Sequence, residues 1–80
     1  MRIIFDLLRT ARKRGGISKT QAVRRTNLNF HAIEHYLGRL QSGQLLRSEI
    51  SDEHPTQYFV TDEGERLYRL LTEVYKLIKK

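Results

Sequence analysis

Apolar and polar residues alternate at helical spacing along the first half of this 80-residue chain. Apolar residues three or four positions apart are followed by a pair of glycines, which predicts a helix over about residues 2–14. Ser18 begins a capping-box pattern, so a second helix is expected over 19–25. Asn29 suits the N-cap position of a third helix, expected over 30–41. The first half therefore predicts three helices joined by short turns.

The pattern changes in the second half of the chain. Two short stretches, 45–50 and 57–60, are rich in large apolar or β-branched residues. A polar segment with Pro55 separates them, which predicts a β-hairpin. Thr61 suits the N-cap of a last helix over 62–79. The order helix, helix, helix, strand, strand, helix predicts a mainly α fold with a small β-hairpin, the arrangement of a winged helix-turn-helix.

Some expectations concern single residues. Gly43 is expected to end the third helix as a left-handed C-cap residue, because glycine adopts positive φ without strain. Ile33, Leu37 and Leu40 recur at helical spacing and are expected to be buried. The aromatic residues expected in the core are Phe5, Phe30, Tyr36 and Tyr58.

The last predicted helix carries an apolar stripe that continues to its end. At 18 residues, the helix exceeds the average of about 11–12 residues in globular domains. It could fold back on its own domain or pair with its copy in a second chain, and its length favours pairing. The charges beside the stripe leave parallel and antiparallel pairing open. The residues expected in the dimer interface are Leu67, Leu70, Leu71, Val74, Leu77 and Ile78.

Charge is distributed unequally along the chain, whose formal net charge is +6. Residues 1–47 hold ten Lys or Arg and two acidic residues, a balance of +8. Residues 48–80 hold five Lys or Arg and seven acidic residues, a balance of −2. A basic surface around a two-helix motif indicates a polyanionic partner, with a merely solvated surface as the alternative.

The polar face of the third predicted helix is the candidate DNA-reading surface. A helix-turn-helix places its second helix in the major groove and its first helix across the phosphate backbone. The residues expected to contact bases are His31, Glu34, His35 and Arg39. The residues expected to contact phosphates are Lys19, Thr20, Arg24, Arg25, Arg47, Arg12 and Arg14. The alternative for the helix faces is that they are merely solvated. Glu34 could instead organise a neighbouring cation, and Arg12 and Arg14 could stabilise the C-terminus of their own helix.

Other kinds of function lack a supporting pattern. The chain has no cysteine, and nothing directs a third ligand towards His31 and His35, so no metal site is expected. No nucleophile with its base and no glycine-rich phosphate loop is visible, so neither an enzyme nor a cofactor is expected. No apolar run approaches the roughly 20 residues that span a bilayer. We therefore expect a cytoplasmic, nucleoid-associated protein with no membrane contact and no evident small-molecule ligand.

A further pattern covers nearly the whole chain. It consists of Gly16, Ser18, Thr20, Thr26-Asn27-Leu28-Asn29-Phe30, Tyr36-Leu37, Leu40, Gly43, Leu45-Leu46, Tyr58 and Thr61-x-x-Gly64. In these residues the chain resembles the small archaeal winged-helix DNA-binding proteins that carry a C-terminal coiled-coil helix. The resemblance implies double-stranded DNA as partner, the third helix as recognition helix, and a homodimer formed by antiparallel pairing of the last helix. Asp52 and Glu53 at the hairpin tip depart from the Lys or Arg of many DNA-gripping wings.

Together these patterns predict one compact unit with two parts. Residues 1–61 are expected to form a winged-helix DNA-binding domain and residues 62–80 a dimerisation helix. The expected function is binding of double-stranded DNA as a homodimer, as a sequence-specific transcriptional regulator. An architectural chromatin protein of low sequence specificity is the alternative, and a winged-helix module that binds protein is a weaker one. The mixture of His, Glu and Arg on the third helix favours the regulator.

Overall fold

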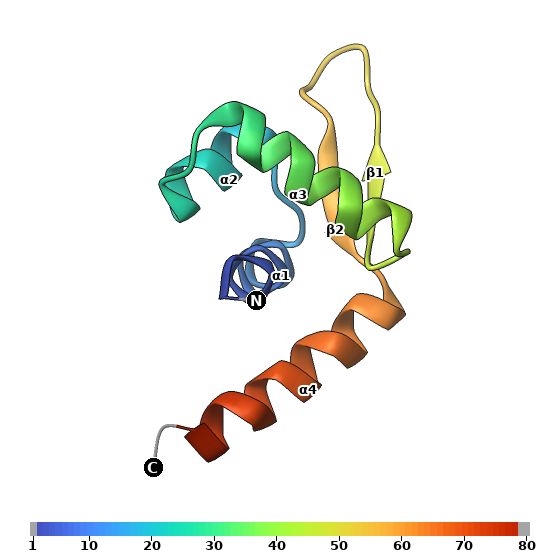
Figure 1. Ribbon diagram of the computed structural model, residues 1–80. Coiled ribbons are helices and arrows are strands. Elements are labelled where there is room, and N and C mark those ends of the chain that lie inside the picture. Colours follow the sequence, from blue (N-terminus) through green and yellow to red (C-terminus); the bar gives the residue numbers. More distant parts are fainter. Residues whose placement is uncertain (1, 79–80) are drawn as a thin grey trace.

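The computed structural model describes residues 2–78, which form four helices and a two-stranded antiparallel sheet (Figure 1). The elements are α1 (Arg2–Arg14), α2 (Lys19–Thr26), α3 (Phe30–Ser42), β1 (Leu46–Glu49), β2 (Gln57–Val60) and α4 (Asp62–Ile78). This order confirms the predicted winged helix-turn-helix. The first strand is one residue shorter at each end than expected, and the expected last residue of the final helix, 79, lies outside the described residues.

The helices begin where their capping side chains predict. Ser18 accepts a hydrogen bond from the backbone N–H of Gln21, whose side chain in turn accepts one from the N–H of Ser18. Asn29 and Thr61 each accept the backbone N–H of the residue three positions on, at 2.7 and 3.0 Å. These bonds satisfy donors that the first turn of a helix leaves without partners. The start of each of these three helices is therefore encoded locally.

The core lies where α1, α2 and α3 meet the hairpin. Its buried residues are Leu7, Leu8, Ala11, Ile17, Ala22, Ile33, Leu37, Leu40, Leu46 and Tyr58. Ile17, between α1 and α2, also pairs with β2, because it exchanges backbone hydrogen bonds of 2.9 and 2.7 Å with Tyr58. Each fully buried leucine or isoleucine contributes roughly 1.5–3 kcal/mol. The α1–α2 connection is thus held on the sheet as well as on the helices.

The end of α3 differs from the sequence-based expectation. Gly43 has φ −81° and ψ 4°, so its expected left-handed conformation is wrong. The left-handed residue is Gln44, with φ 61°. This turn lets the N–H of Leu45 reach the carbonyl of Leu40 at 2.8 Å, and it directs the Gln44 carbonyl towards the hydroxyl of Thr61 at 2.6 Å. The long-range bond to the start of α4 therefore explains where the chain turns.

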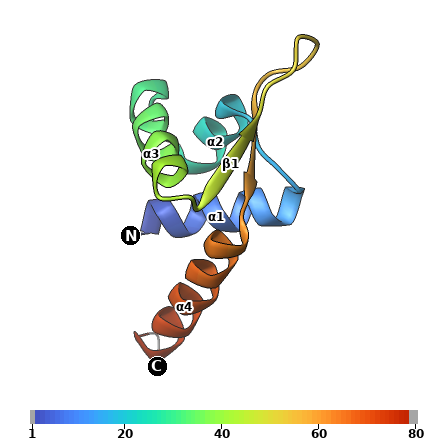
Figure 2. The ribbon, with the colours of Figure 1, turned by 90° about the vertical axis from the view of Figure 1, so that its right-hand side faces the viewer.

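The first turn of α4 packs closely against the α3–β1 connection. A Cβ atom on Gly64 would lie 2.1 Å from the carbonyl oxygen of Leu45, so only glycine permits this approach. The N–H of Thr61 also donates to the same carbonyl, at 3.2 Å. These contacts fix the direction in which α4 leaves the domain, away from α3 and the hairpin loop (Figure 2).

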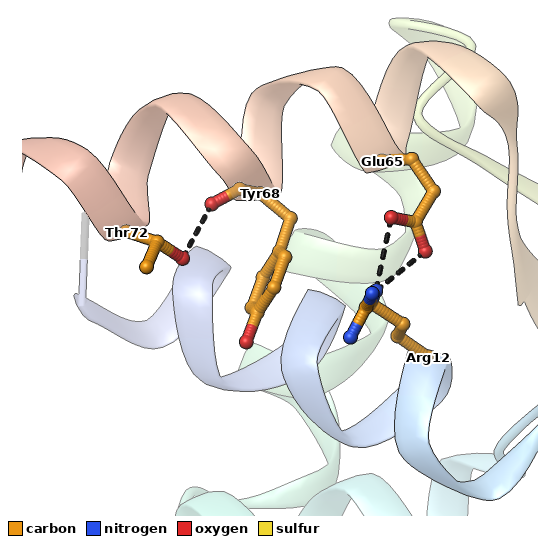
Figure 3. Close-up of polar contacts among 4 residues, drawn as sticks. All are labelled: Arg12, Glu65, Tyr68 and Thr72. Carbon is orange, nitrogen blue, oxygen red and sulfur yellow. Dashed lines mark hydrogen bonds and ion pairs between the residues drawn. The ribbon is translucent and has the colours of Figure 1, made fainter.

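Beyond its first turn, α4 packs against α1. The ring of Phe5 stacks on Tyr68 at a centroid distance of 5.3 Å and meets Tyr75 edge-on at 4.9 Å. Arg12 donates to Glu65 at 2.7 Å and lies 5.0 Å from the centre of the Tyr68 ring (Figure 3). Aromatic packing and an ion pair thus join the first and last helices. Within residues 2–78, no helix combines the length and apolar content that crossing a bilayer requires.

Candidate nucleic-acid interface

The two sides of α3 differ as the sequence predicts. Ile33, Leu37 and Leu40 are buried. The residues expected to contact bases, His31, Glu34, His35 and Arg39, are all exposed. In Figure 2, α3 runs along one edge of the molecule, at the end away from the last turns of α4. The structure therefore presents the polar face of α3 outward, as a reading helix requires.

Glu34 is engaged with a cation of the preceding helix. Its carboxylate accepts a hydrogen bond from the Lys19 amine at 3.0 Å. This bond raises the pKa of Lys19 above its ordinary value, because it stabilises the charged amine. Both side chains are partly exposed, and such pairs contribute about 1 kcal/mol or less. The contact favours the interpretation in which Glu34 organises a neighbouring cation.

Phe30, expected in the core, is 49% exposed, so that expectation is wrong. It is the first residue of α3, and the Lys19 amine lies 5.9 Å from the centre of its ring. Its spacing from Ile33 and Leu37 predicts burial, but α3 begins beyond the edge of the core. The local sequence does not show which turn of a helix extends beyond the core. Tyr36, like the buried Tyr58, packs in or against the core as expected.

Gly38 lies in the middle of α3, on its exposed side, and no sequence pattern marks it as a site residue. Nothing lies within 4 Å of the position that its Cβ would occupy. Glycine in a helix interior is less favourable than alanine by about 1 kcal/mol. The fold of this chain therefore does not require glycine here. A glycine on an outward helix face permits close approach of another molecule.

The cations of α2 and the end of α1 form one basic surface. Thr20, Arg24 and Arg25 are exposed on α2. Arg25 and residues of α1 surround a groove of about 230 Å³. The α1 residues are Asp6, Arg9, Thr10, Lys13 and Arg14. The structure thus brings Arg14 beside Arg25, although eleven positions separate them in the sequence.

Two other expected phosphate contacts have partners within the chain. Arg12 forms the ion pair with Glu65 that joins α1 to α4 (Figure 3). Arg47 on β1 pairs with Glu49, and its guanidinium lies 4.7 Å from the centre of the Phe59 ring. Their side chains remain about half exposed, so these exposed ion pairs are weak. Arg12 faces α4, whereas Arg14 belongs to the basic surface with Arg25.

The apolar stripe of α4 is divided between two faces. Leu71 is buried and Leu67 partly buried within the chain itself. The other four residues expected in the dimer interface remain largely exposed: Leu70 at 59%, Val74 at 47%, Leu77 at 70% and Ile78 at 71%. We call these four residues the α4 stripe. One part of the expected interface therefore completes the domain, and the other part has no apolar cover within residues 2–78.

A second groove lies between α1 and α4 and has a volume of about 430 Å³. It is lined by Arg2, Phe5, Asp6, Arg9, Thr72, Tyr75 and Lys76. Small-molecule sites combine apolar walls with a few polar groups in this way. The expected lack of a small-molecule ligand thus stays a prediction. Among residues 2–78, no group of three His, Cys, Asp or Glu side chains is placed to hold a metal ion.

The sequence matches the winged helix-turn-helix family over residues 1–79. The chain belongs to this family. Winged helix-turn-helix domains are DNA-binding modules rather than enzymes. No curated protein sequence matches the chain at a significant level.

Solved structures with the same fold include two bacterial proteins. One is BpsR of Bordetella bronchiseptica, whose DNA binding is regulated by 6-hydroxynicotinic acid; its TM-score is 0.84 at 19% identity. The other is the YusO protein from Bacillus subtilis, with a TM-score of 0.87 at 18% identity. Each match covers 96% of this chain and 56% of the other chain, so this chain spans little more than half the length of either protein.

Proposed function

We propose that this chain binds double-stranded DNA as a homodimer and acts as a sequence-specific transcriptional regulator. The observation that carries the proposal is the exposed polar face of α3 on a winged helix-turn-helix scaffold. His31, His35 and Arg39 lie on that face without an ion pair to another residue of 2–78. Arginine can donate two hydrogen bonds to guanine, and histidine can donate or accept at base edges. In this proposal α3 enters the major groove.

The basic surface would position α3 by contacts to phosphates. Arg14, Arg24 and Arg25 are exposed and have no ion-pair partner within residues 2–78. Lys19 and Thr20 lie at the start of α2, the helix that crosses the backbone in helix-turn-helix docking. Phosphate contacts fix the register of a protein on DNA without reading sequence. Specificity would therefore rest on α3 and affinity on the surrounding cations.

The α4 stripe supports the homodimer. Four large apolar side chains along one exposed helix face gain stability when a second helix covers them. A second copy of the chain offers the same stripe, and a two-fold interface places the same surface on both subunits. Antiparallel pairing is what the resemblance to archaeal winged-helix proteins with a C-terminal coiled-coil helix implies. A dimer would place two α3 helices on one duplex and increase avidity where both reach their sites.

One contact favours an architectural protein of low sequence specificity as the second candidate. Because Glu34 is engaged with Lys19, fewer α3 side chains remain to discriminate between bases. Binding would then depend mainly on phosphates and on DNA deformability. Such a protein would coat or bridge DNA instead of selecting one site.

Two measurements test these candidates. Affinity for a random duplex is measured at two salt concentrations, and log K should fall with a slope of about −0.9 per phosphate neutralised. A pooled selection of bound oligonucleotides then separates the two roles. A sharp consensus supports the regulator, and its absence supports the architectural protein. Undetectable or salt-independent binding to duplex DNA would refute both.

A further inference from the structure

Phe30 presents a large apolar ring to solvent, because α3 begins beyond the edge of the core. It is 49% exposed, whereas all other Phe and Tyr side chains are buried or half-buried. Exposing a large aromatic ring forgoes the stabilisation that its burial provides. Phe30 belongs to α3, whereas the α4 stripe lies on a helix that runs away from α3 (Figure 2), so the two are separate apolar surfaces. The ring is therefore available to a different partner.

Phe30 lies at the position where helix-turn-helix domains contact the edges of DNA bases. In helix-turn-helix docking, residues at the N-terminal end of the second helix contact bases in the major groove. Phe30 is the first residue of α3. Glu34, one turn later, holds Lys19 at 3.0 Å, and the Lys19 amine lies 5.9 Å from the ring centre. The ring thus lies near the Lys19–Glu34 pair, which joins the start of α2 to the polar face of α3.

We propose that Phe30 recognises thymine by packing against its C5-methyl group. This rests on the proposed DNA binding and adds a base preference to it. Thymine alone presents a methyl group in the major groove, and phenylalanine is among the side chains that contact it. The major-groove edges of adenine, guanine and cytosine are polar throughout, and a phenyl ring that covers polar groups without a hydrogen bond is unfavourable, whereas thymine adds an apolar methyl group beside its O4. Phe30 would therefore favour A·T pairs where the helix begins.

Replacing thymine by uracil tests the methyl contact directly, because uracil lacks the methyl group and keeps the same base pairing. Two duplexes of the same sequence are compared, one with thymine and one with uracil. The sequence is the selected site, or an A/T-rich sequence if no consensus emerges. The wild-type chain should bind the thymine duplex about fourfold more tightly for each methyl group buried. Replacing thymines one at a time then locates the contacted position.

Variants assign the effect to one side chain. Phe30→Ala should abolish the preference by weakening binding to the thymine duplex only, and Phe30→Leu should retain part of it. Ile50→Ala serves as the matched control, because Ile50 is another exposed apolar residue, at 84%, outside α3. It should keep the full preference. Circular dichroism melting checks that the variants fold, and the wild-type comparison decides the proposal even without them.

Each contrary outcome has a distinct meaning. Equal wild-type affinities for the two duplexes overturn the thymine contact but leave DNA binding established. A preference that persists in Phe30→Ala shows that the methyl group does not act through Phe30, which also overturns the proposal. Tighter binding to single strands than to duplexes would assign the ring to base stacking and overturn it as well. Absence of binding to any DNA refutes the proposed function itself.

Discussion

Two exposed surfaces, on α3 and α4, differ in chemistry and therefore in the partner each can take. The outward face of α3 is polar and charged, so water satisfies it when no partner is present. The α4 stripe is apolar, so exposure to water leaves its burial energy unrealised. A polar surface suits reversible recognition of a charged partner, whereas an apolar one suits lasting association. The comparison supports the proposal that α3 meets DNA and that α4 meets a second copy of the chain.

The largest effect is expected at the α4 stripe. Combining Leu70→Glu with Leu77→Glu places two charges in the proposed interface and should yield a folded monomer by analytical ultracentrifugation. Loss of the second DNA-binding head should lower affinity for a two-site duplex by about 10²- to 10⁴-fold. Lys76→Gln, on the same helix, lowers the net charge by one without touching the stripe and should stay dimeric. A double variant that remains dimeric would place the interface elsewhere.

The next effect should separate reading from positioning around α3. Arg39→Ala should cost about 1–3 kcal/mol on the preferred site and relax base choice there, because a bidentate contact is lost. Arg24→Ala should weaken all sequences alike and reduce the salt slope by about 1. Fluorescence anisotropy on matched and scrambled duplexes measures both. Equal losses on every duplex for both variants would contradict the assignment of α3 as the reader.

A smaller effect is expected at Gly38, where a substitution should increase stability but weaken DNA binding. Gly38→Ala should raise the free energy of unfolding by about 1 kcal/mol, because alanine favours the helix and the site has room for Cβ. The added methyl group should weaken DNA binding if the face of α3 lies close to a groove. Urea unfolding and duplex titration measure the two effects. Increased stability with unchanged DNA affinity would argue against close contact at this face.

The smallest effect concerns the Lys19–Glu34 pair. Glu34→Gln should lower stability by less than about 1 kcal/mol and should strengthen DNA binding, because a negative charge leaves the interface. Since Glu34 raises the pKa of Lys19, the stabilisation is present below the ordinary value of 10.5 and is lost as pH rises through the raised value. Thermal unfolding at increasing pH should therefore show that the extra stability of the wild type over Glu34→Gln shrinks above about pH 10.5. Weaker, less selective binding of the variant would instead make Glu34 a base reader.

The local part of the fold could be predicted because its signals are local. Ser18, Asn29 and Thr61 accept backbone donors three residues away, and the apolar spacing of each helix marks its buried side. The turn after α3 could not be predicted in the same way. Gln44 instead of Gly43 takes the left-handed conformation, in a turn that is bonded to Thr61, seventeen positions later. A bond over that distance leaves no mark in the local sequence.

By itself, the sequence determined the order of the elements, their approximate bounds and the polar face of α3, because helical periodicity and capping act within a few residues. Only the tertiary structure decided which side chains remain uncovered and which cations have partners. Phe30 shares the spacing of buried residues but lies beyond the core, and Leu71 follows directly on the exposed Leu70 but packs within the chain. Exposure depends on the neighbouring elements across space, and periodicity along one helix does not specify them.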